Sequence, residues 1–267
     1  MKLVFLGTGR AQVTECYNTC FITDDSGKLV LTDGGGGIYI LHQLKAAGYR
    51  WQDIGDIIVT HKHMDHLLGV MWIVRMIAQS MKSGKYKGEA RIYGHDEVLS
   101  LIKRYSDDLL TPDAAGFVGD RIVLREVHDG EKVSIQGRDY TFFDIHSTKA
   151  KQYGYTFGLP SGGKLTCCGD EPYTDFEKKY AEGAVWLLHE AFCLKSDADR
   201  FKPYEKHHST VADAAENAES LGVKNLVLYH TEDTEIAERK KLYTEEASRY
   251  FGGRVYVPDD LEEIKIG

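Results

Sequence analysis

The sequence lacks the features of disulfide-stabilised, membrane-spanning and strongly basic proteins. Its five cysteines form an odd set without CxxC spacing, which indicates neither a disulfide framework nor a zinc knuckle and favours a reducing, cytoplasmic location. The first apolar run, at residues 3–6, is too short for a signal-peptide core or a membrane span. Acidic residues outnumber lysine and arginine by 41 to 33, and the net charge of -8 disfavours a surface built to neutralise nucleic-acid phosphates.

The chain also lacks a linker that would divide it into domains. Only five prolines interrupt its 267 residues, and no Pro/Gly/Ser-rich or low-complexity block separates one part from another. The hydrophobic content of 42% is enough for one substantial core. We therefore expect residues 1–267 to form a single domain.

Apolar periodicity predicts strands and helices that alternate along the chain. We expect strands over residues 2–6, 29–32, 57–59, 121–127, 132–135, 140–145, 153–159, 164–168, 185–188, 225–229 and 254–257. We expect helices over residues 38–47, 67–81, 211–221 and 235–251, the third of them opened by a capping box of Thr210 and Asp213. The strands between residues 121 and 166 resemble a meander, and the loop at 109–119 is a candidate lid or subunit contact. The pattern predicts an α/β protein in which helices cover the outer faces of two sheets.

Four candidate metal ligands directly follow the buried strand at 57–59: His61, His63, Asp65 and His66. Alternate residues of an extended segment point the same way, so His61 and His63 can face one ion, while the other two, on the turn into a helix, can face a second. Imidazole and carboxylate without thiolate suit Zn²⁺, Mn²⁺ or iron. Because buried charge of this density must be paired or metal-bound, we predict a metal site rather than a solvated loop.

Three further candidates, His146, Asp170 and His230, each follow another predicted strand. Side chains at strand ends are held by rigid elements and open to a cleft. A single histidine in such a place is often a hydrogen-bonded structural residue. The recurrence of the same placement predicts that the three complete the site.

The run HKHMDH at residues 61–66 matches the HxHxDH signature of the metallo-β-lactamase superfamily, and the order Asp33, HxHxDH, His146, Asp170, His230 resembles its motif series. Within the superfamily the chain is similar to the ribonuclease Z branch of phosphodiesterases. That similarity rests on LGTG at residues 6–9, DGG at 33–35, HEAF at 189–192 and HST at 208–210. The resemblance implies an αββα sandwich of two mixed sheets flanked by helices.

The resemblance also implies a role for each motif residue. One metal would be bound by His61, His63 and His146, the other by Asp65, His66 and His230, with Asp170 as the bridge and Asp33 as support for a ligating imidazole. Glu190 and His208 would form an acid/base pair near the leaving group, and Asp65 would orient the attacking water or accept its proton. Two divalent ions, with Zn²⁺ as the first expectation, lower the pKa of a water and offset charge on the phosphoryl oxygens.

The chain departs from ribonuclease Z where that branch carries an inserted arm that grips tRNA, because the segments on both sides of Asp170 have ordinary lengths. Its HEAT-like motif ends in Phe192 where the pattern has threonine. We therefore expect a small or single-stranded phosphodiester substrate, met near the cleft by basic residues such as Lys149, Lys151 and Lys164.

Other functions stay open at the level of sequence. They are a tRNA 3′-processing endoribonuclease, a thioesterase or lactonase of the same superfamily, and a non-catalytic binding protein. We expect no membrane association, while nucleic-acid binding is undecided. A homodimer is common in this branch.

Overall fold

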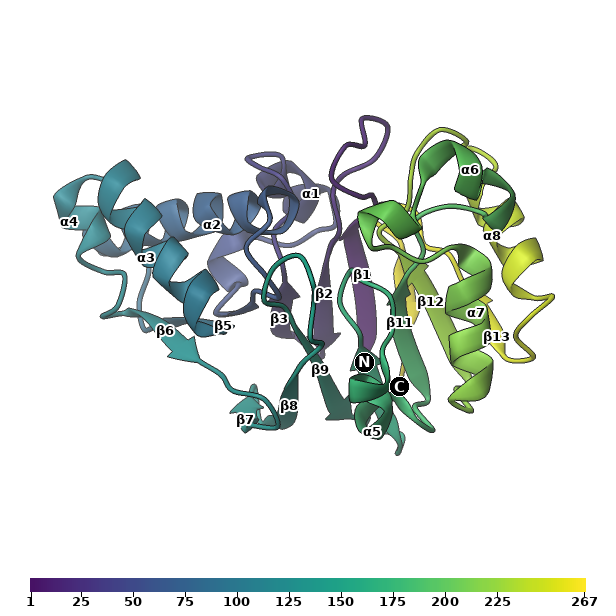
Figure 1. Ribbon diagram of the computed structural model, residues 1–267. Helices are drawn as coiled ribbons and strands as arrows, with labels where there is room; N and C mark the ends of the chain where they lie inside the picture. Colours follow the sequence, from purple (N-terminus) through teal and green to yellow (C-terminus); the bar gives the residue numbers. More distant parts are fainter.

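The computed structural model describes all 267 residues, which form two seven-stranded sheets packed face to face between helices (Figure 1). The first sheet has the order β14-β1-β2-β3-β4-β5-β6. Its strands are β1 (Lys2–Gly7), β2 (Cys20–Asp25), β3 (Lys28–Thr32), β4 (Asp56–Ile58), β5 (Ala90–Gly94), β6 (Ile122–Glu126) and β14 (Glu263–Lys265). The second sheet has the order β13-β12-β11-β10-β9-β8-β7. Its strands are β7 (Lys132–Ile135), β8 (Arg138–Asp144), β9 (Tyr153–Gly158), β10 (Lys164–Cys167), β11 (Trp186–Glu190), β12 (Asn225–Tyr229) and β13 (Arg254–Tyr256).

Both sheets are mixed, and they share one pairing order. The first four strands of the first sheet, from β14 to β3, pair antiparallel, and β3 to β6 pair parallel. The second sheet repeats this order, antiparallel from β7 to β10 and parallel from β10 to β13. Parallel neighbours require crossover connections, which here are mostly helical, and their carboxyl ends lie at one edge of each sheet.

The helices form the two outer layers. Beside the first sheet lie α1 (Ile40–Ala46), α2 (Met64–Lys82), α3 (Asp96–Leu109) and α4 (Pro112–Ala115), and beside the second lie α5 (Lys178–Ala181), α6 (Ala198–Phe201), α7 (Val211–Ser220) and α8 (Arg239–Ala247). Short 3-10 turns occur at η1 (Trp51–Asp53), η2 (Asp175–Glu177), η3 (Lys195–Asp197) and η4 (Tyr204–Lys206). No helix combines the length and the apolar character needed to cross a membrane.

Apolar side chains fill the three spaces between these four layers. A cluster rich in aromatic residues, including Phe5, Phe21 and Tyr140, lies between the sheets. A larger cluster lies between the first sheet and α2 and α3, and a third joins the second sheet to α7 and α8. The αββα sandwich predicted from the sequence is therefore confirmed.

The structure corrects several predicted elements. The predicted strand at 121–127 is β6, which pairs parallel with β5 in the first sheet and so does not belong to the meander of β7 to β10. The predicted helix at 235–251 is shorter, since α8 begins at Arg239. The loop at 109–119 contains α4, whose first residue is Pro112. The capping box of α7 is confirmed, with the Thr210 hydroxyl accepting the amide of Asp213.

Candidate metal centre

Three of the predicted site residues follow strands in the left-handed backbone conformation. Asp33 follows β3 with φ 57°, His146 follows β8 with φ 57°, and His230 follows β12 with φ 56°. Asp and His are among the few side chains that enter this region with any frequency, and such positions cluster at functional sites. The backbone thus turns sharply where each strand reaches the edge of its sheet.

The HxHxDH run crosses from the end of β4 into the first turn of α2, which starts at Met64. His61 and His66 are buried, and His63 is partly exposed. The rings form a row in which neighbouring centroids are 4.5 Å apart for His63 and His61, 4.2 Å for His61 and His66, and 5.5 Å for His66 and His230. The row continues to His208, whose ring centroid is 5.1 Å from that of His230.

Asp170 touches imidazoles from both predicted metal sets. Its Oδ2 atom lies 3.5 Å from His61 Nε2, 3.3 Å from His66 Nε2 and 3.5 Å from His230 Nε2. Asp65 Oδ2 approaches two of the same rings, at 3.4 Å from His66 Nε2 and 3.5 Å from His230 Nε2. The two carboxylates therefore share the imidazoles of one compact cluster.

Several buried polar atoms of this cluster have no hydrogen-bond partner. They are His66 Nε2, both ring nitrogens of His230, and Asp170 Oδ1. Buried polar atoms are nearly always satisfied, so a group of orphans that converge on one point indicates a missing shared partner. Nitrogen and carboxylate donors without thiolate fit a divalent cation in that position. The residues present therefore fit the implied metal ions.

The electrostatics of the cluster keep its carboxylates ionised. Burial alone would raise the pKa of Asp170, but the His61, His66 and His230 imidazoles hold it well below its ordinary value. Burial opposes His66 too, yet the Asp65 and Asp33 carboxylates raise the pKa of this imidazole well above its usual range. Burial lowers the pKa of His61 and of His230, which favours the neutral form that ligates metals.

Asp33 supports the cluster from behind. Its Oδ2 atom lies 2.8 Å from His66 Nδ1, while the amide and hydroxyl of Thr60 donate to its two oxygens at 2.9 and 2.7 Å. A carboxylate on the second nitrogen of a ligating imidazole fixes its tautomer and raises its basicity. The direction of the His66 ring is thus set by the strand ends of β3 and β4.

One predicted ligand lies outside the cluster. His146 is exposed, and its ring packs on Phe176 at a centroid distance of 4.0 Å, so it does not join the groups of close ligand atoms. His63 approaches the row through the 2.9 Å contact of its Nδ1 with His61 Nε2. The structure therefore brings together His61, Asp65, His66, Asp170 and His230, with His63 beside them.

Glu190 and His208 lie at the far end of the row. Glu190 ends β11 with no exposed surface, and its Oε2 atom lies 3.4 Å from His208 Nδ1. The Ser209 amide donates to the other carboxylate oxygen. Lys149 Nζ lies 3.4 Å from His208 Nε2. The pair predicted from the HEAT-like and HST motifs is therefore adjacent and opens toward the metal ligands.

Phe192, which departs from the HEAT pattern, packs against this pair. Its ring stacks on His208 with a centroid distance of 4.9 Å and an interplanar angle of 20°. The Arg10 guanidinium lies 4.9 Å and the Lys206 ammonium 5.2 Å from the centre of the same ring. Phe192 therefore holds two cations and an imidazole around one aromatic group.

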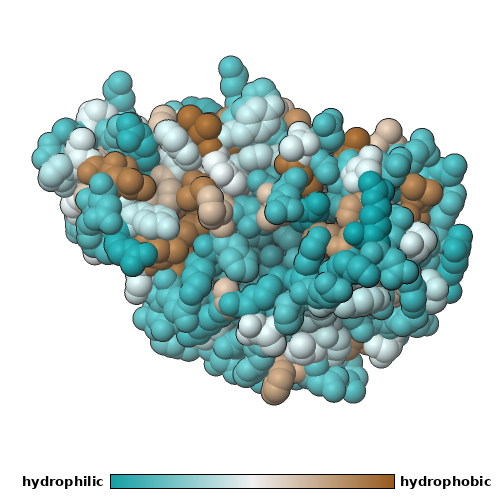
Figure 2. Space-filling model, turned by 45° about the horizontal axis from the view of Figure 1, so that its top comes forward, coloured by the Kyte–Doolittle hydropathy of each residue, from teal (hydrophilic) through white to brown (hydrophobic).

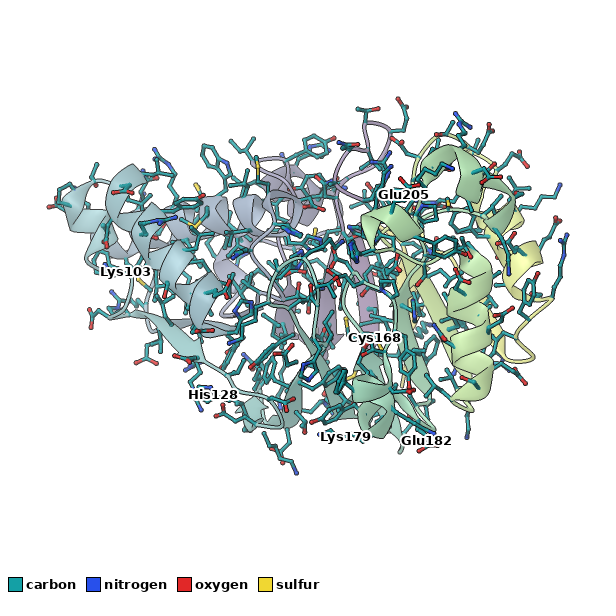
Figure 3. The ribbon with its side chains drawn as sticks, in the orientation of Figure 1. Lys103, His128, Cys168, Lys179, Glu182 and Glu205 are labelled. Carbon is teal, nitrogen blue, oxygen red and sulfur yellow. The ribbon has the colours of Figure 1, made fainter.

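These residues surround a cleft of about 520 Å³. Figure 2 shows a hydrophilic hollow in the middle of the face that this cleft occupies. Its rim carries Arg10, Lys149 and Lys206, opposite the carboxylates Asp65 and Asp170. Cys168 lies between the end of β10 and Asp170 (Figure 3).

Sequence reasoning anticipated only one of the three rim cations. Lys149 lies at the cleft as expected, but Lys151 forms an ion pair with Asp96 at 2.6 Å, and Lys164 starts β10 at the strand end remote from Asp170. Arg10 and Lys206 come from loops far apart in the chain. No motif marks them, because only the folded structure brings them to the rim.

Comparisons with known proteins agree with this geometry. The family model described as Anti-Pycsar protein Apyc1 matches residues 1–242. The ribonuclease Z of Pyrobaculum arsenaticum is 30% identical over 310 residues, covering 100% of this chain and 98% of that protein. The ribonuclease Z of Streptococcus gordonii is 26% identical over 317 residues, covering all of both chains.

Solved structures share the fold over the same length. The metallo-β-lactamase fold protein YhfI of Bacillus subtilis superimposes with a TM-score of 0.78, at 18% identity and with 98% of each chain covered. The short form of human tRNase Z gives a TM-score of 0.75 at 22% identity, with 100% of each chain covered.

Proposed function

This chain belongs to the family of the anti-Pycsar protein Apyc1, within the ribonuclease Z-like part of the metallo-β-lactamase superfamily, and from that premise we propose that it hydrolyses a small or single-stranded phosphodiester. Membership makes it a metal-dependent hydrolase of the phosphodiesterase kind. One observation carries the choice of chemistry at phosphorus: the Glu190–His208 pair lies directly beside the ligand cluster. An alkoxide leaving group needs such a proton donor.

We propose two ions, with Zn²⁺ as the first choice and Mn²⁺ or iron as alternatives. His61, His63, Asp65, His66, Asp170 and His230 would hold them, and His146 would join by turning its exposed ring away from Phe176. When bound, such ions supply a nucleophile at neutral pH and offset charge on the phosphoryl oxygens. Asp170 Oδ2, which contacts imidazoles of both sets, is the proposed bridge.

Side chains of the cleft would orient the attacking water, protonate the leaving oxygen and bind the phosphodiester. Asp65, buried and ionised at the cleft, orients the attacking water or accepts its proton. Glu190 holds the Nδ1 side of the His208 ring, which leaves Nε2 toward the cleft to protonate the departing oxygen. Arg10, Lys149 and Lys206 supply positive charge for the phosphodiester oxygens that do not react.

Precursor tRNA is the less favoured substrate. The alignment to the Pyrobaculum ribonuclease Z spans 310 positions against the 267 residues of this chain, so that relative carries segments with no counterpart here. The net charge of -8 gives no overall attraction for a long polyanion, whose binding relies on many Lys and Arg contacts. Three cations at one cleft suit a ligand with one or two phosphates.

A substrate panel tests the proposal. The metal-loaded protein is assayed on bis-aryl phosphodiesters, cyclic nucleotides, precursor tRNA, thioesters and lactones, together with the His208→Ala variant. We expect turnover of small phosphodiesters and a loss of about 10²-fold or more in His208→Ala. Salt-sensitive processing of precursor tRNA, with little activity on small diesters, would show the substrate class to be wrong. Preferred hydrolysis of thioesters or lactones, unaffected by His208→Ala, would support chemistry at carbon instead.

We further propose that the chain forms a homodimer through the face that carries α2. Ile38, Tyr39 and Leu109 expose more than half of their surface, and Leu109 lines a hollow together with Met71 and Trp72. Figure 2 shows hydrophobic patches on this side of the molecule. Contiguous apolar surface of this kind marks interaction sites. Light scattering should show a dimer for the purified protein and a weaker dimer for the Leu109→Glu variant. A monomer in both samples would refute the proposal.

We also propose a reducing, cytoplasmic compartment. All five cysteines are free thiols, and four of them are buried. Thiol labelling after lysis under trapping conditions would find them reduced, whereas a disulfide would contradict this location.

A further inference from the structure

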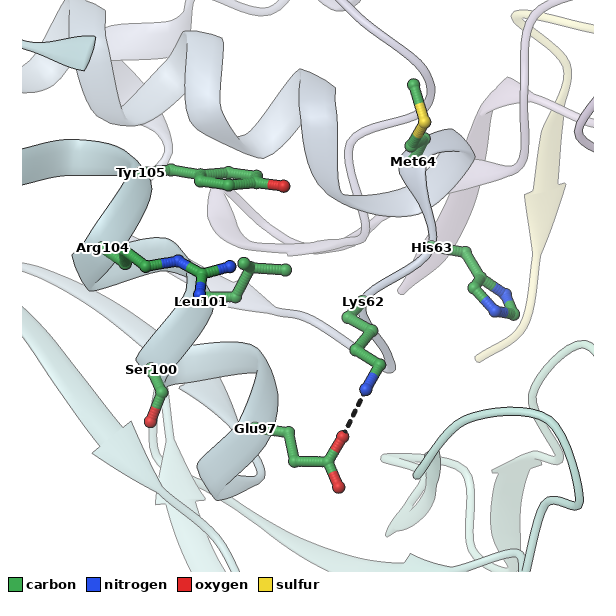
Figure 4. Close-up of a pocket in the computed structure, with 8 residues that line it drawn as sticks. All are labelled: Lys62, His63, Met64, Glu97, Ser100, Leu101, Arg104 and Tyr105. Atoms are coloured by element: carbon green, nitrogen blue, oxygen red, sulfur yellow. Dashed lines mark hydrogen bonds and ion pairs between the residues drawn. The ribbon is translucent and has the colours of Figure 1, made fainter. Parts of the chain in front are cut away.

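A second cavity adjoins the metal cleft and takes no part in the chemistry described above. It has a volume of about 670 Å³, within the range of about 300–1,000 Å³ typical of small-molecule sites. It lies between the segment that enters α2 and the exposed side of α3 (Figure 4). His63 and Met64 line both this cavity and the metal cleft, so the two spaces form one groove.

The position of the cavity indicates which half of the substrate it can bind. The row of imidazoles runs from His63 through His61, His66 and His230 to His208. The proposed proton donor to the leaving oxygen stands at the His208 end. The cavity opens at the His63 end. A substituent that stays on phosphorus, rather than the leaving group, can therefore extend into it.

The wall on α3 offers an aromatic face beside an unpaired cation. The Arg104 guanidinium is exposed and lies 5.8 Å from the centre of the Tyr105 ring. The nearby Asp107 carboxylate is taken by Lys103 at 2.5 Å. Figure 4 shows the Tyr105 hydroxyl end and the Arg104 guanidinium directed from α3 into the cavity.

A polar edge and an apolar cap complete the lining of the cavity. Lys62 Nζ and Glu97 Oε2 form an ion pair at 2.6 Å across the cavity, where both partners remain partly exposed. Met64 caps the junction with the metal cleft and is 70% exposed. Leu101 adds a second apolar contact from α3.

We propose that this cavity binds the nucleobase of the substrate half that remains on phosphorus, a proposal that rests on the phosphodiesterase function above. A nucleobase has a flat apolar face that stacks on an aromatic side chain and an edge of hydrogen-bonding groups. Tyr105, Leu101 and Met64 match the face, and Arg104 with the Lys62–Glu97 pair matches the edge. A lone phosphate would leave the apolar wall without a partner, and an aliphatic chain would leave the charged one without a partner.

Calorimetry provides a test that does not depend on turnover. The metal-loaded protein is titrated with thymidine 5′-monophosphate and with 2-deoxyribose 5-phosphate, which lacks the base. We expect the nucleotide to bind about tenfold more tightly, since stacking of one base supplies a difference of that order. Tyr105→Leu and Arg104→Ala should each reduce the preference, and Tyr105→Phe should keep it. Lys85→Ala is the matched control, because Lys85 is exposed and lies outside this cavity.

Kinetics separates this proposal from the function on which it rests. The substrates are the p-nitrophenyl ester of thymidine 5′-monophosphate and ethyl p-nitrophenyl phosphate, which share a leaving group. Tyr105→Leu should raise KM for the nucleotide ester about tenfold, with kcat retained, and leave ethyl p-nitrophenyl phosphate unaffected. Equal effects on both esters, or a base preference in calorimetry that Tyr105→Leu leaves intact, would overturn the subsite. If the unaltered protein hydrolyses neither ester, the phosphodiesterase function fails, while calorimetry still decides whether the cavity binds a base.

Discussion

Glu177 is a carboxyl group that the fold buries without a cation beside it. It has no exposed surface, its Oε1 atom accepts the Thr174 amide at 3.0 Å, and its Oε2 atom has no partner. Burial raises the pKa of Glu177 from 4.5 to about 8, against weaker lowering by the Thr174 amide and the Cys168 thiol. The folded protein therefore keeps a proton that the unfolded chain loses above pH 4.5.

This burial predicts a loss of stability as the pH rises. The contribution of Glu177 is fully present below its unfolded pKa and is lost as the pH rises to about 8, at about 1 kcal/mol per pH unit. Glu177→Gln keeps the acceptor for Thr174 but has no proton to lose, so its free energy of unfolding should decline less between pH 5 and pH 8. Urea unfolding of both proteins across that window measures the difference. Parallel pH profiles would show that Glu177 is not the cause.

Asp170 is the residue on which we expect the proposed metal centre to depend most. Because its Oδ2 atom lies within 3.5 Å of three imidazoles, Asp170→Ala removes a ligand common to both predicted metal sets. We expect the variant to retain less than half of the bound metal after dialysis, measured by elemental analysis. Asp175→Ala, an exposed neighbour in η2, should retain all of it. Full occupancy in Asp170→Ala would reject the bridging role.

Most of the cluster could be predicted at the residue scale, because its members directly follow strands and carry chemistry that burial would otherwise penalise. His61 and His230 carry that signal, and Asp65 and His66 follow His61 on the turn that enters α2. The orientation of the His146 side chain could not be predicted, since a ring at an exposed strand end can adopt more than one rotamer. The rim cations depend on contacts between distant loops, which leave no local pattern.

At the scale of elements, α7 begins directly after the proposed proton donor, His208. Thr210 caps this helix through its bond from the Asp213 amide, and it immediately follows His208 and Ser209. Thr210→Ala should lower the free energy of unfolding by about 1 kcal/mol, because an amide at the helix start loses its acceptor. Thr210→Ser also loses the methyl group but keeps the hydroxyl, so it should retain most of that stability. Equal losses in both variants would assign the effect to packing instead.

Most of the elements that sequence periodicity missed are strands, which need a distant partner. β14 has three residues, and it is a strand because Leu3 and its neighbours in β1 pair with it. β2 and β5, in the same sheet as β14, were missed as well. The helix α3 was not predicted either. Long buried elements such as α2 were predicted because their apolar residues repeat within the element itself.

At the scale of the whole molecule, removal of metal should lower stability without dividing the unfolding transition. The core between the sheets contains residues from both ends of the chain, such as Leu3 and Ile264, so we propose that residues 1–267 unfold as one unit. Metal at about 100 times its dissociation constant adds about 2.7 kcal/mol to the folded state. Calorimetric scans with Zn²⁺ and with a chelator should each show one transition, at a lower Tm in the chelator. Two separated transitions would contradict the single unit.

The shared pairing order of the two sheets gives each strand of one sheet an equivalent strand in the other. Matching the sheets strand by strand aligns β3 with β10, β4 with β11 and β5 with β12. His95, the first residue after β5, then corresponds to His230, the first residue after β12. His95 is fully buried with neither ring nitrogen hydrogen-bonded. At these equivalent strand ends one imidazole joins the cluster of candidate ligands, while the other is enclosed in the protein interior.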